Sequence, residues 1–269
     1  MTPWLSCAAD VGIPEKGCFT MTTARKLTVL ATLAVLPLAF GAASHSSTTA
    51  SHSSTTAAPQ RHDLAAMKAE QAALTPAQEL ESLRRGNERF ASGKPEPHDM
   101  LHDRKITAAG QYPHAIILTC IDSRVPPEII FDAGLGELFS DRVAGNIVDA
   151  DLVGSMEYAC EEAGSKLVLV MGHTSCGAVK GACDGLKMGN LTGLLQKIEP
   201  AIASVQNVPG ERNSKNHQFV DAVVEANVRQ TLKRIREMSP ILRDMEHEGK
   251  IQIVGSVYDL ETGKVRFLK

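Results

Sequence analysis

Two apolar runs decide the fold: Ala115–Thr119 (AIILT), which leads into Cys120–Arg124 (CIDSR), and Lys166–Met171 (KLVLVM), which leads into Gly172–Gly177 (GHTSCG). Each run has the length of a strand and no polar alternation, and helix signals follow both. Continuous apolar strands that alternate with helices predict a parallel sheet buried on both faces. Polar clusters at the carboxyl ends of such strands meet at one edge of the sheet, where ligands bind.

The helices predicted after these strands begin at Pro126 and Pro127, running through Phe131, and at Ala178–Cys183. The C-terminal part alternates in the same way. Its expected elements are a helix over Asn216–Met238, a helix from Ser239-Pro240 to Gly249, a strand over Ile251–Tyr258, a turn over Glu261–Gly263 and a strand over Val265–Leu268. A closing hairpin predicts one antiparallel edge, hence an α/β fold with a mixed, mainly parallel sheet flanked by helices.

The folded domain is expected to begin with an N-terminal helical arm. Thr75, Pro76 and Gln78 have the spacing of a capping box with proline at the first helical position. Leu80, Leu83 and Phe90 then give the helix an apolar face, and Gly93 is a natural stop.

The chain before this helix has the features of an export signal. Arg25 and Lys26 precede the apolar run Leu27–Phe40, which is too short to span a membrane, and small residues follow it. We expect residues 1–20 to be an extension from a misassigned start codon, 21–43 a signal peptide cleaved near Ala42 or Ala43, 44–74 a low-complexity linker and 75–269 the catalytic domain. The mature protein is then periplasmic or secreted without stable membrane insertion; if residues 1–20 are genuine, it stays in the cytoplasm.

Composition excludes several classes of protein. Lys and Arg number 28 against 31 Asp and Glu, a net charge of −3, so a nucleic-acid partner is not expected. Six cysteines in 269 residues are too few for a disulfide scaffold. Cys160 and Cys183 could pair in an oxidising compartment, but the place of Cys183, one or two helical turns past Cys176, favours a buried thiol.

Cysteine and histidine in the two polar clusters predict a zinc site. Cys120, His173 and Cys176 offer two thiolates and one imidazole, which select zinc over magnesium or calcium. Three protein ligands leave one position of a tetrahedral site for a catalytic water. Asp122 and Arg124 can form a charge-assisted pair that keeps the carboxylate ionised; without that pair, Asp122 could close onto the metal.

In these motifs the chain resembles the β-class carbonic anhydrases, from about Thr75 to the C-terminus. The segments that carry the resemblance are CIDSRVPPE, GELF (Gly136–Phe139), RVAGN (Arg142–Asn146), MEYA (Met156–Ala159), GHTSCG and the closing YDLETG. The resemblance implies one zinc per chain on Cys120, His173 and Cys176, and an Asp122–Arg124 catalytic dyad. The implied reaction is the reversible hydration of carbon dioxide to bicarbonate and a proton, by attack of zinc-bound hydroxide.

At two further positions the chain resembles the open-site subtype of that family. The subtype that closes its aspartate onto zinc carries tryptophan three residues before the first cysteine, where this chain has Ile117. The open subtype carries a substrate-binding glutamine nine residues before that cysteine, where Gln111 stands. The resemblance also places Phe139, Ala144, Gly145, Tyr158 and Gly177 around the substrate pocket, some of them across a subunit interface. The minimal active unit is therefore expected to be a homodimer.

Two other functions stay open at this stage. An enzyme with the same fold and zinc ligands could instead hydrolyse carbonyl sulfide or carbon disulfide, because access to the site rather than the ligands decides the substrate. The chain could also be a zinc-bearing interaction protein, although such a protein is expected to lose the dyad or the glutamine, and both are present here. No proton shuttle can be named from the sequence.

Overall fold

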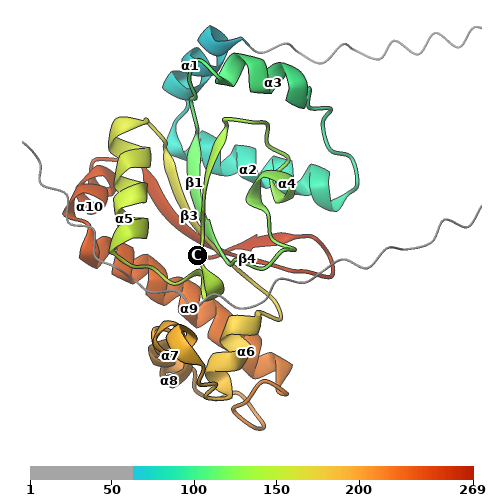
Figure 1. Cartoon of the computed structure of the whole chain (residues 1–269), viewed down its shortest axis with the longest axis vertical. Helices are drawn as coiled ribbons and strands as arrows, with labels where there is room; N and C mark the ends of the chain where they lie inside the picture. The colour runs from blue at the N-terminus through green and yellow to red at the C-terminus, as the bar shows by residue number, and fades with distance from the viewer. Residues whose placement is uncertain (1–62) are drawn as a thin grey trace, which may run out of the picture. The chain divides into compact units, whose positions relative to one another are not determined.

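A computed structural model of the chain describes residues 63–269. The expected start-codon extension, the signal peptide and the linker up to residue 62 lie outside these residues. No helix in the described part is long and apolar enough to cross a membrane. The elements form a five-stranded sheet with helices on both faces (Figure 1).

The sheet has the order β2-β1-β3-β4-β5. Its strands are β1 (Ala115–Thr119), β2 (Leu138–Arg142), β3 (Leu167–His173), β4 (Gln252–Tyr258) and β5 (Val265–Phe267). The first four are parallel, and β5 pairs antiparallel with β4. The predicted mixed, mainly parallel sheet is confirmed, with β5 as the expected antiparallel edge.

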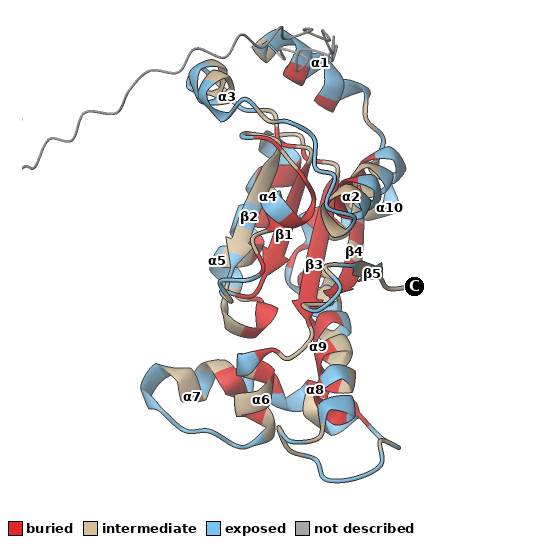
Figure 2. Cartoon of the chain, turned by 90° about the vertical axis from the view of Figure 1, so that its right-hand side faces the viewer, coloured by how far each residue is buried: buried red, intermediate tan, exposed pale blue. Residues whose placement is uncertain are grey.

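Both faces of the sheet are buried, as continuous apolar strands require. Ile117 and Leu169 contribute to one core with residues of α2 (Pro76–Ala91) and the first half of α9 (His217–Met238). Ile116 and Val168, their neighbours along the strands, contribute to the other core. Its helices are α5 (Ala150–Glu157), the second half of α9 and α10 (Pro240–His247). Figure 2 shows the buried residues concentrated on the central strands.

The remaining helices lie at the two ends of the sheet (Figures 1 and 2). At the amino ends of the parallel strands lie α1 (Leu64–Ala73) and α3 (Met100–Thr107). At the carboxyl ends lie α6 (Gly177–Cys183), α7 (Gly189–Gln196) and α8 (Glu199–Ser204). A short α4 (Pro127–Ile130) follows β1, and a π-helix, η2 (Tyr158–Glu162), extends α5.

The predicted start of α2 is confirmed in detail. Thr75 Oγ1 accepts from Gln78 N at 3.3 Å, and Gln78 Oε1 accepts from Thr75 N at 2.9 Å, which completes the capping box. Leu83 is buried, and Gly93 adopts a positive φ of 69° directly after the helix.

The linker predicted over residues 44–74 ends earlier than expected, because Leu64–Ala73 is a helix. Asp63 caps it by accepting from Ala66 N at 2.7 Å, and its sequence consists mostly of strong helix formers. Gln71 anchors it to the domain by donating to Pro113 O and Ala163 O, each at 2.8 Å.

Strand β2 has no counterpart among the predicted elements. Its sequence, LFSDR, shows neither a continuous apolar run nor a clean alternation, because it is an edge strand whose side chains are partly buried or exposed. Its place is set by pairing with β1, in which Ile116 stands opposite Phe139 and Thr119 opposite Arg142.

Candidate metal centre

Three predicted ligands converge at the carboxyl ends of β1 and β3. Cys120 directly follows β1, His173 ends β3, and Cys176 is the residue before α6. The two strands are hydrogen-bonded neighbours, so residues far apart in sequence meet here. The ligand atoms of Cys120, His173 and Cys176 all lie within 4.8 Å of one another, and all three residues are buried.

The histidine is held in the tautomer that a metal ligand needs. Its Nδ1 lies 2.9 Å from the carbonyl oxygen of Thr174, and that oxygen can only accept a hydrogen bond. Nε2 therefore presents its lone pair to the cysteine sulfurs, and within the described residues it has no hydrogen-bond partner. A buried imidazole nitrogen in this state fits a metal ion.

The two cysteines form a coupled pair. Their sulfur atoms are 3.9 Å apart, and the Cys176 thiol donates to Cys120. This bond lowers the pKa of Cys120, whereas the adjacent sulfur and burial raise the pKa of Cys176. Two thiolates so close together in a buried site need a cation between them. Two sulfurs and one imidazole nitrogen are a donor set suited to zinc.

The predicted pair of Asp122 and Arg124 is formed. The Asp122 carboxylate accepts from Arg124 N at 3.0 Å, Nε at 2.9 Å and Nη2 at 2.7 Å. These bonds hold the pKa of Asp122 well below its usual range, so the carboxylate is ionised at neutral pH. Its Oδ2 lies 3.9 Å from His173 Nε2, beside the metal ligands.

Arg142 supports this corner, although sequence reasoning gave it no role. Its Nε donates to Cys120 O at 3.1 Å, and its Nη2 donates to Asp122 O. The guanidinium therefore joins the end of β2 to the backbone of the Cys120–Asp122 turn. The available signal was its place as the first residue of the RVAGN segment.

An apolar cavity of about 230 Å³ opens beside Cys120 and Asp122. Two predicted pocket residues, Ala144 and Gly177, line it. Leucine side chains from α7 and the segment before it complete the lining, namely Leu186, Leu191 and Leu195. Gly145, also predicted here, donates its N–H to Cys120 Sγ at 3.3 Å.

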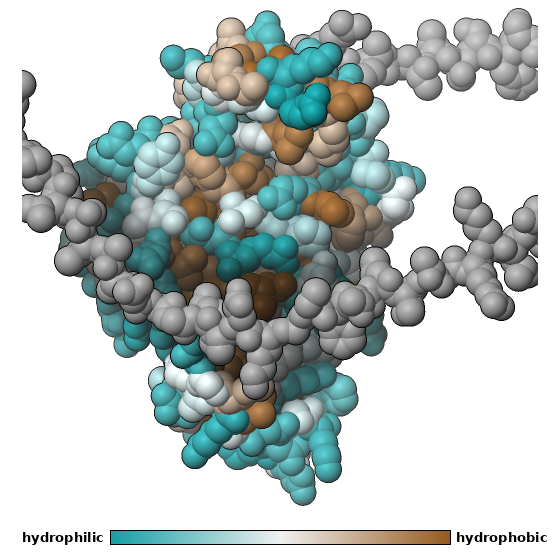
Figure 3. All heavy atoms as spheres, in the orientation of Figure 1, coloured by the Kyte–Doolittle hydropathy of each residue, from teal (hydrophilic) through white to brown (hydrophobic). Residues whose placement is uncertain are grey.

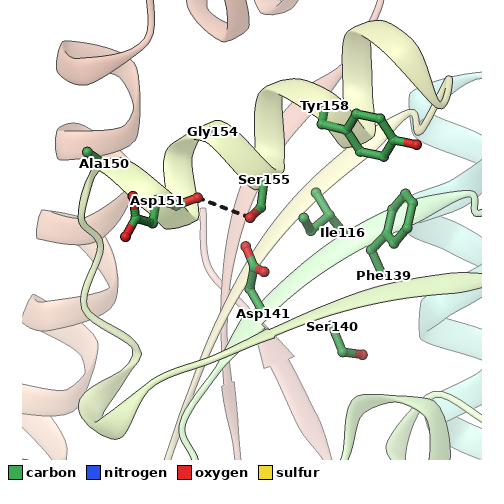
Figure 4. A pocket seen from close by; sticks show the side chains of 9 residues that line it. All are labelled: Ile116, Phe139, Ser140, Asp141, Ala150, Asp151, Gly154, Ser155 and Tyr158. Carbon is green, nitrogen blue, oxygen red and sulfur yellow. Dashed lines mark hydrogen bonds between the residues drawn. The ribbon is translucent and has the colours of Figure 1, made fainter. Parts of the chain in front are cut away.

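The structure places Phe139 and Tyr158 in a different pocket. Their rings are in contact, with centroids 6.2 Å apart, at one end of a cavity of about 620 Å³ between β2 and α5 (Figure 4). Phe139 stands three residues before the carboxyl end of β2, which is about 10 Å along a strand. Tyr158 is 56% exposed. Within one chain these two rings do not line the cavity beside the metal ligands.

Gln111 also lies apart from the metal ligands within one chain. It is exposed and stands between α3 and the amino end of β1, whereas Cys120 follows the carboxyl end of that strand. In Figure 1 these are the two opposite ends of the sheet. One chain therefore assembles the ligands, the dyad, Ala144, Gly145 and Gly177, and leaves Gln111, Phe139 and Tyr158 elsewhere.

The fold and this site define an α/β protein whose two cysteines and one histidine can hold a metal ion, with the three-ligand donor set that is typical of catalytic zinc. The family model described as carbonic anhydrase matches residues 115–265. Carbonic anhydrase 2 of Mycobacterium tuberculosis is 35% identical over 195 residues, covering 70% of this chain and 91% of that protein.

Solved structures agree with this match. A β-carbonic anhydrase of Coccomyxa, solved with acetazolamide, is 25% identical with a TM-score of 0.55, covering 71% of this chain and 85% of that one. A tetrameric β-carbonic anhydrase of Sordaria macrospora, 24% identical over 62% of this chain and 86% of that one, shows the same fold with a TM-score of 0.55. The chain belongs to the β-carbonic anhydrase family, an enzyme family that hydrates carbon dioxide with zinc, so the predicted fold and enzyme class are confirmed.

Proposed function

We propose that the chain is an open-site carbonic anhydrase with one zinc per chain, in which Asp122 stays on Arg124 and does not bind the metal. The observation that carries this proposal is the set of three hydrogen bonds that Arg124 donates to the Asp122 carboxylate. Ile117 and Gln111, which stand at the positions that distinguish the subtypes, agree with it. Bicarbonate-gated closure of the site is then not expected.

Each part of the site then has a separate task in the reaction. Cys120, His173 and Cys176 hold zinc, which when bound lowers the pKa of water from about 16 to about 7. Asp122, ionised and fixed by Arg124, accepts a hydrogen bond from the attacking oxygen and orients its lone pair toward carbon. A new C–O bond forms, bicarbonate leaves and one proton passes to solvent or buffer.

The apolar cavity next to Asp122 suits carbon dioxide. Its lining of Ala144, Gly177 and leucine side chains offers few polar groups that would retain a charged product. A linear, uncharged molecule can therefore bind beside the metal ligands, whereas the charged bicarbonate favours release into water.

We propose that a second copy of the chain completes the substrate pocket. Phe139, Tyr158 and Gln111 lie away from the zinc ligands of their own chain, and Phe139 and Tyr158 face an open cavity at the β2 edge. Large exposed apolar side chains include Ile121, Ile129 and Tyr158, and Figure 3 shows apolar surface among hydrophilic side chains on the face it presents. A homodimer is the minimal active unit, and larger assemblies are compatible with it.

Stopped-flow hydration of carbon dioxide, with the zinc of the same sample counted, tests the proposed activity. We expect rapid hydration at neutral pH with about one zinc per chain. Carbonyl sulfide and carbon disulfide assayed in parallel distinguish the first alternative. Bound zinc with no turnover of any of the three substrates would favour an interaction protein.

We also propose that the protein is exported and acts in the periplasm or outside the cell. The support is the sequence alone: Arg25 and Lys26, the apolar run Leu27–Phe40 and the small residues after it. N-terminal sequencing of the native protein should give a start near Ala42 or Ala43. A native start upstream of Met21 would contradict export.

A further inference from the structure

The turn that contains Gly145 contacts a metal ligand directly. Gly145 N–H donates to Cys120 Sγ at 3.3 Å. Gly145 and Asn146 both have positive φ, of 71° and 42°. Asn146 is not a glycine, so two successive residues in the left-handed backbone region cost free energy unless other contacts hold them.

Two side chains of α9 provide those contacts. Asn227 Nδ2 donates to Gly145 O at 2.7 Å, and Thr231 Oγ1 donates to Asn146 O at 3.2 Å. Asn227 and Thr231 are one helical turn apart, so they lie on the same face of α9, and they are 1% and 2% exposed. Both peptide groups that follow the two positive-φ residues are thus fixed by one helix.

Glycines in the sheet set the position of that helix. A Cβ on Gly172 would lie 2.8 Å from Val228 Cγ2, and one on Gly255 would lie 2.8 Å from Val228 Cγ1. Only glycine at these two positions lets α9 approach β3 and β4 so closely. Gly172 directly precedes the ligand His173, so α9 packs against one ligand segment and hydrogen-bonds the turn that contacts another.

The residue types indicate that Asn227 serves as a donor. The neighbouring buried positions of α9 are mostly valine (Val220, Val223, Val224 and Val228), so an amide here interrupts an apolar face. Asn227 Oδ1 has no hydrogen-bond partner among the described residues. The side chain is therefore retained in the core for its Nδ2 donor, and the atom that receives it is Gly145 O.

We infer that Asn227, with Thr231 beside it, is a positioning residue for the metal centre: it holds the Gly145 N–H on the Cys120 sulfur and so limits how strongly that sulfur donates electrons to the metal. Hydrogen bonds to a ligating atom tune its basicity and orient it. This inference rests on the metal site of the proposed function and adds α9 to it as the element that sets ligand strength.

The test is the thiolate-to-cobalt charge-transfer absorption of the Co²⁺-substituted full chain, measured with the rate of metal loss to a chelator. Asn227→Leu keeps the size of the side chain and removes the donor. We expect its band to move to longer wavelength, because a sulfur without its N–H partner gives up electrons more readily. We also expect metal loss about tenfold faster, because the turn that orients the Cys120 sulfur is no longer held by Asn227 and this effect outweighs the stronger donation.

Two further variants make the outcome decisive. Gln230→Leu removes an exposed amide of the same helix, which donates to Lys197 O, and should leave the band and the rate unchanged. Thr231→Val is nearly isosteric and should shift both readouts in the direction of Asn227→Leu, by less. It replaces Asn227→Leu as the deciding variant if that protein does not fold.

The results separate this inference from the proposed function. A parent protein with the charge-transfer band, and folded Asn227→Leu and Thr231→Val proteins with the parent's band and rate, would overturn the positioning role alone. A parent protein that binds cobalt without any thiolate band would overturn the ligand set and, with it, both proposals.

Discussion

The two ends of strand β1 differ in whether one chain alone brings together the functional residues found there. At the carboxyl end, Cys120 receives Gly145 N–H, and Asp122 is held by Arg124. At the amino end Gln111 is exposed, and at the neighbouring β2 edge Phe139 and Tyr158 line an open cavity. One chain therefore brings the metal-ligating residues and the Asp122–Arg124 pair together by itself, whereas the substrate walls are the part that we propose a second copy provides.

The largest expected effect is the loss of the metal centre itself. Cys176→Ala removes one of three ligands, so we expect bound zinc to be lost and activity to fall by about 10⁶-fold, to the uncatalysed rate. Metal analysis and stopped flow check this. Cys183→Ala, at the far end of the helix that follows Cys176 and outside the site, is the control and should keep both zinc and activity. Equal losses in the two variants would contradict the ligand assignment.

Disrupting the proposed contact with a second copy, at the pocket lined by Phe139 and Tyr158, should lower activity without loss of bound zinc. Tyr158→Glu adds a carboxylate at an exposed position near Asp141 and Asp151 in the same pocket, so association of two copies is disfavoured. We expect a zinc-loaded monomer with activity lower by roughly 10³-fold. Sedimentation measures the association state, zinc analysis the bound metal and stopped flow the activity. Ile241→Glu, at an exposed apolar position on α10, should behave like the parent.

Removing the partner of Asp122 should convert the open site into a closing one. In Arg124→Leu the pKa of Asp122 rises toward its ordinary value, and the freed carboxylate can turn to the metal ligands. We expect hydration to fall about 10²-fold at neutral pH and to recover at alkaline pH. Asp122→Asn, which lacks the carboxylate, should show no such recovery. A uniform loss for Arg124→Leu at every pH would argue against closure.

At the amino end of the sheet a carboxyl group has its pKa raised, whereas the pKa of Asp122 at the carboxyl end is lowered. The raised pKa should make the stability of the fold depend on pH. Burial, then Glu137 and Glu70, raise the pKa of Glu79 to about 8, with His114 Nδ1 at 3.7 Å. A carboxyl whose pKa is raised on folding stabilises the fold below its unfolded value near 4.5, and this stability is lost as pH rises through 8.

Glu79→Gln should therefore weaken the dependence of unfolding free energy on pH. We expect the parent to lose up to about 1.4 kcal/mol per pH unit between these two values, and the variant to lose less. Urea unfolding at pH 5, 6, 7 and 8 measures the difference. Parallel curves for parent and variant would contradict a protonated Glu79 in the folded protein.

The ligands and the dyad could be predicted because each follows a strand whose apolar pattern is unambiguous. Strand β2 could not, since only its pairing with β1 makes LFSDR a strand. The contribution of Asn227 was equally hidden: a polar residue among valines was visible, but its partner Gly145 lies 82 positions away. The outer walls Phe139 and Tyr158 were named through the resemblance, and one chain does not bring them to the zinc ligands.

Whether Cys160 and Cys183 form a disulfide was also left open by the sequence. Within the described residues both are free thiols, Cys160 buried and Cys183 half-buried. Burial raises their pKa to about 12 and about 11, so neither is a reactive thiolate at neutral pH. The sequence left a disulfide open but favoured a buried thiol for Cys183, from its place one or two helical turns past Cys176, and the structure agrees that Cys183 is a free thiol.

One complementation experiment tests the central claim, that two chains build each active site. Cys176→Ala lacks the metal centre but keeps the walls, whereas Phe139→Ala/Tyr158→Ala keeps the metal centre and lacks the walls. Mixed and allowed to exchange subunits, the two inactive proteins should regain about one quarter of the parent activity per chain, from hybrid dimers with one complete site. No gain above the separate variants, with hybrid dimers shown to be present, would contradict the account.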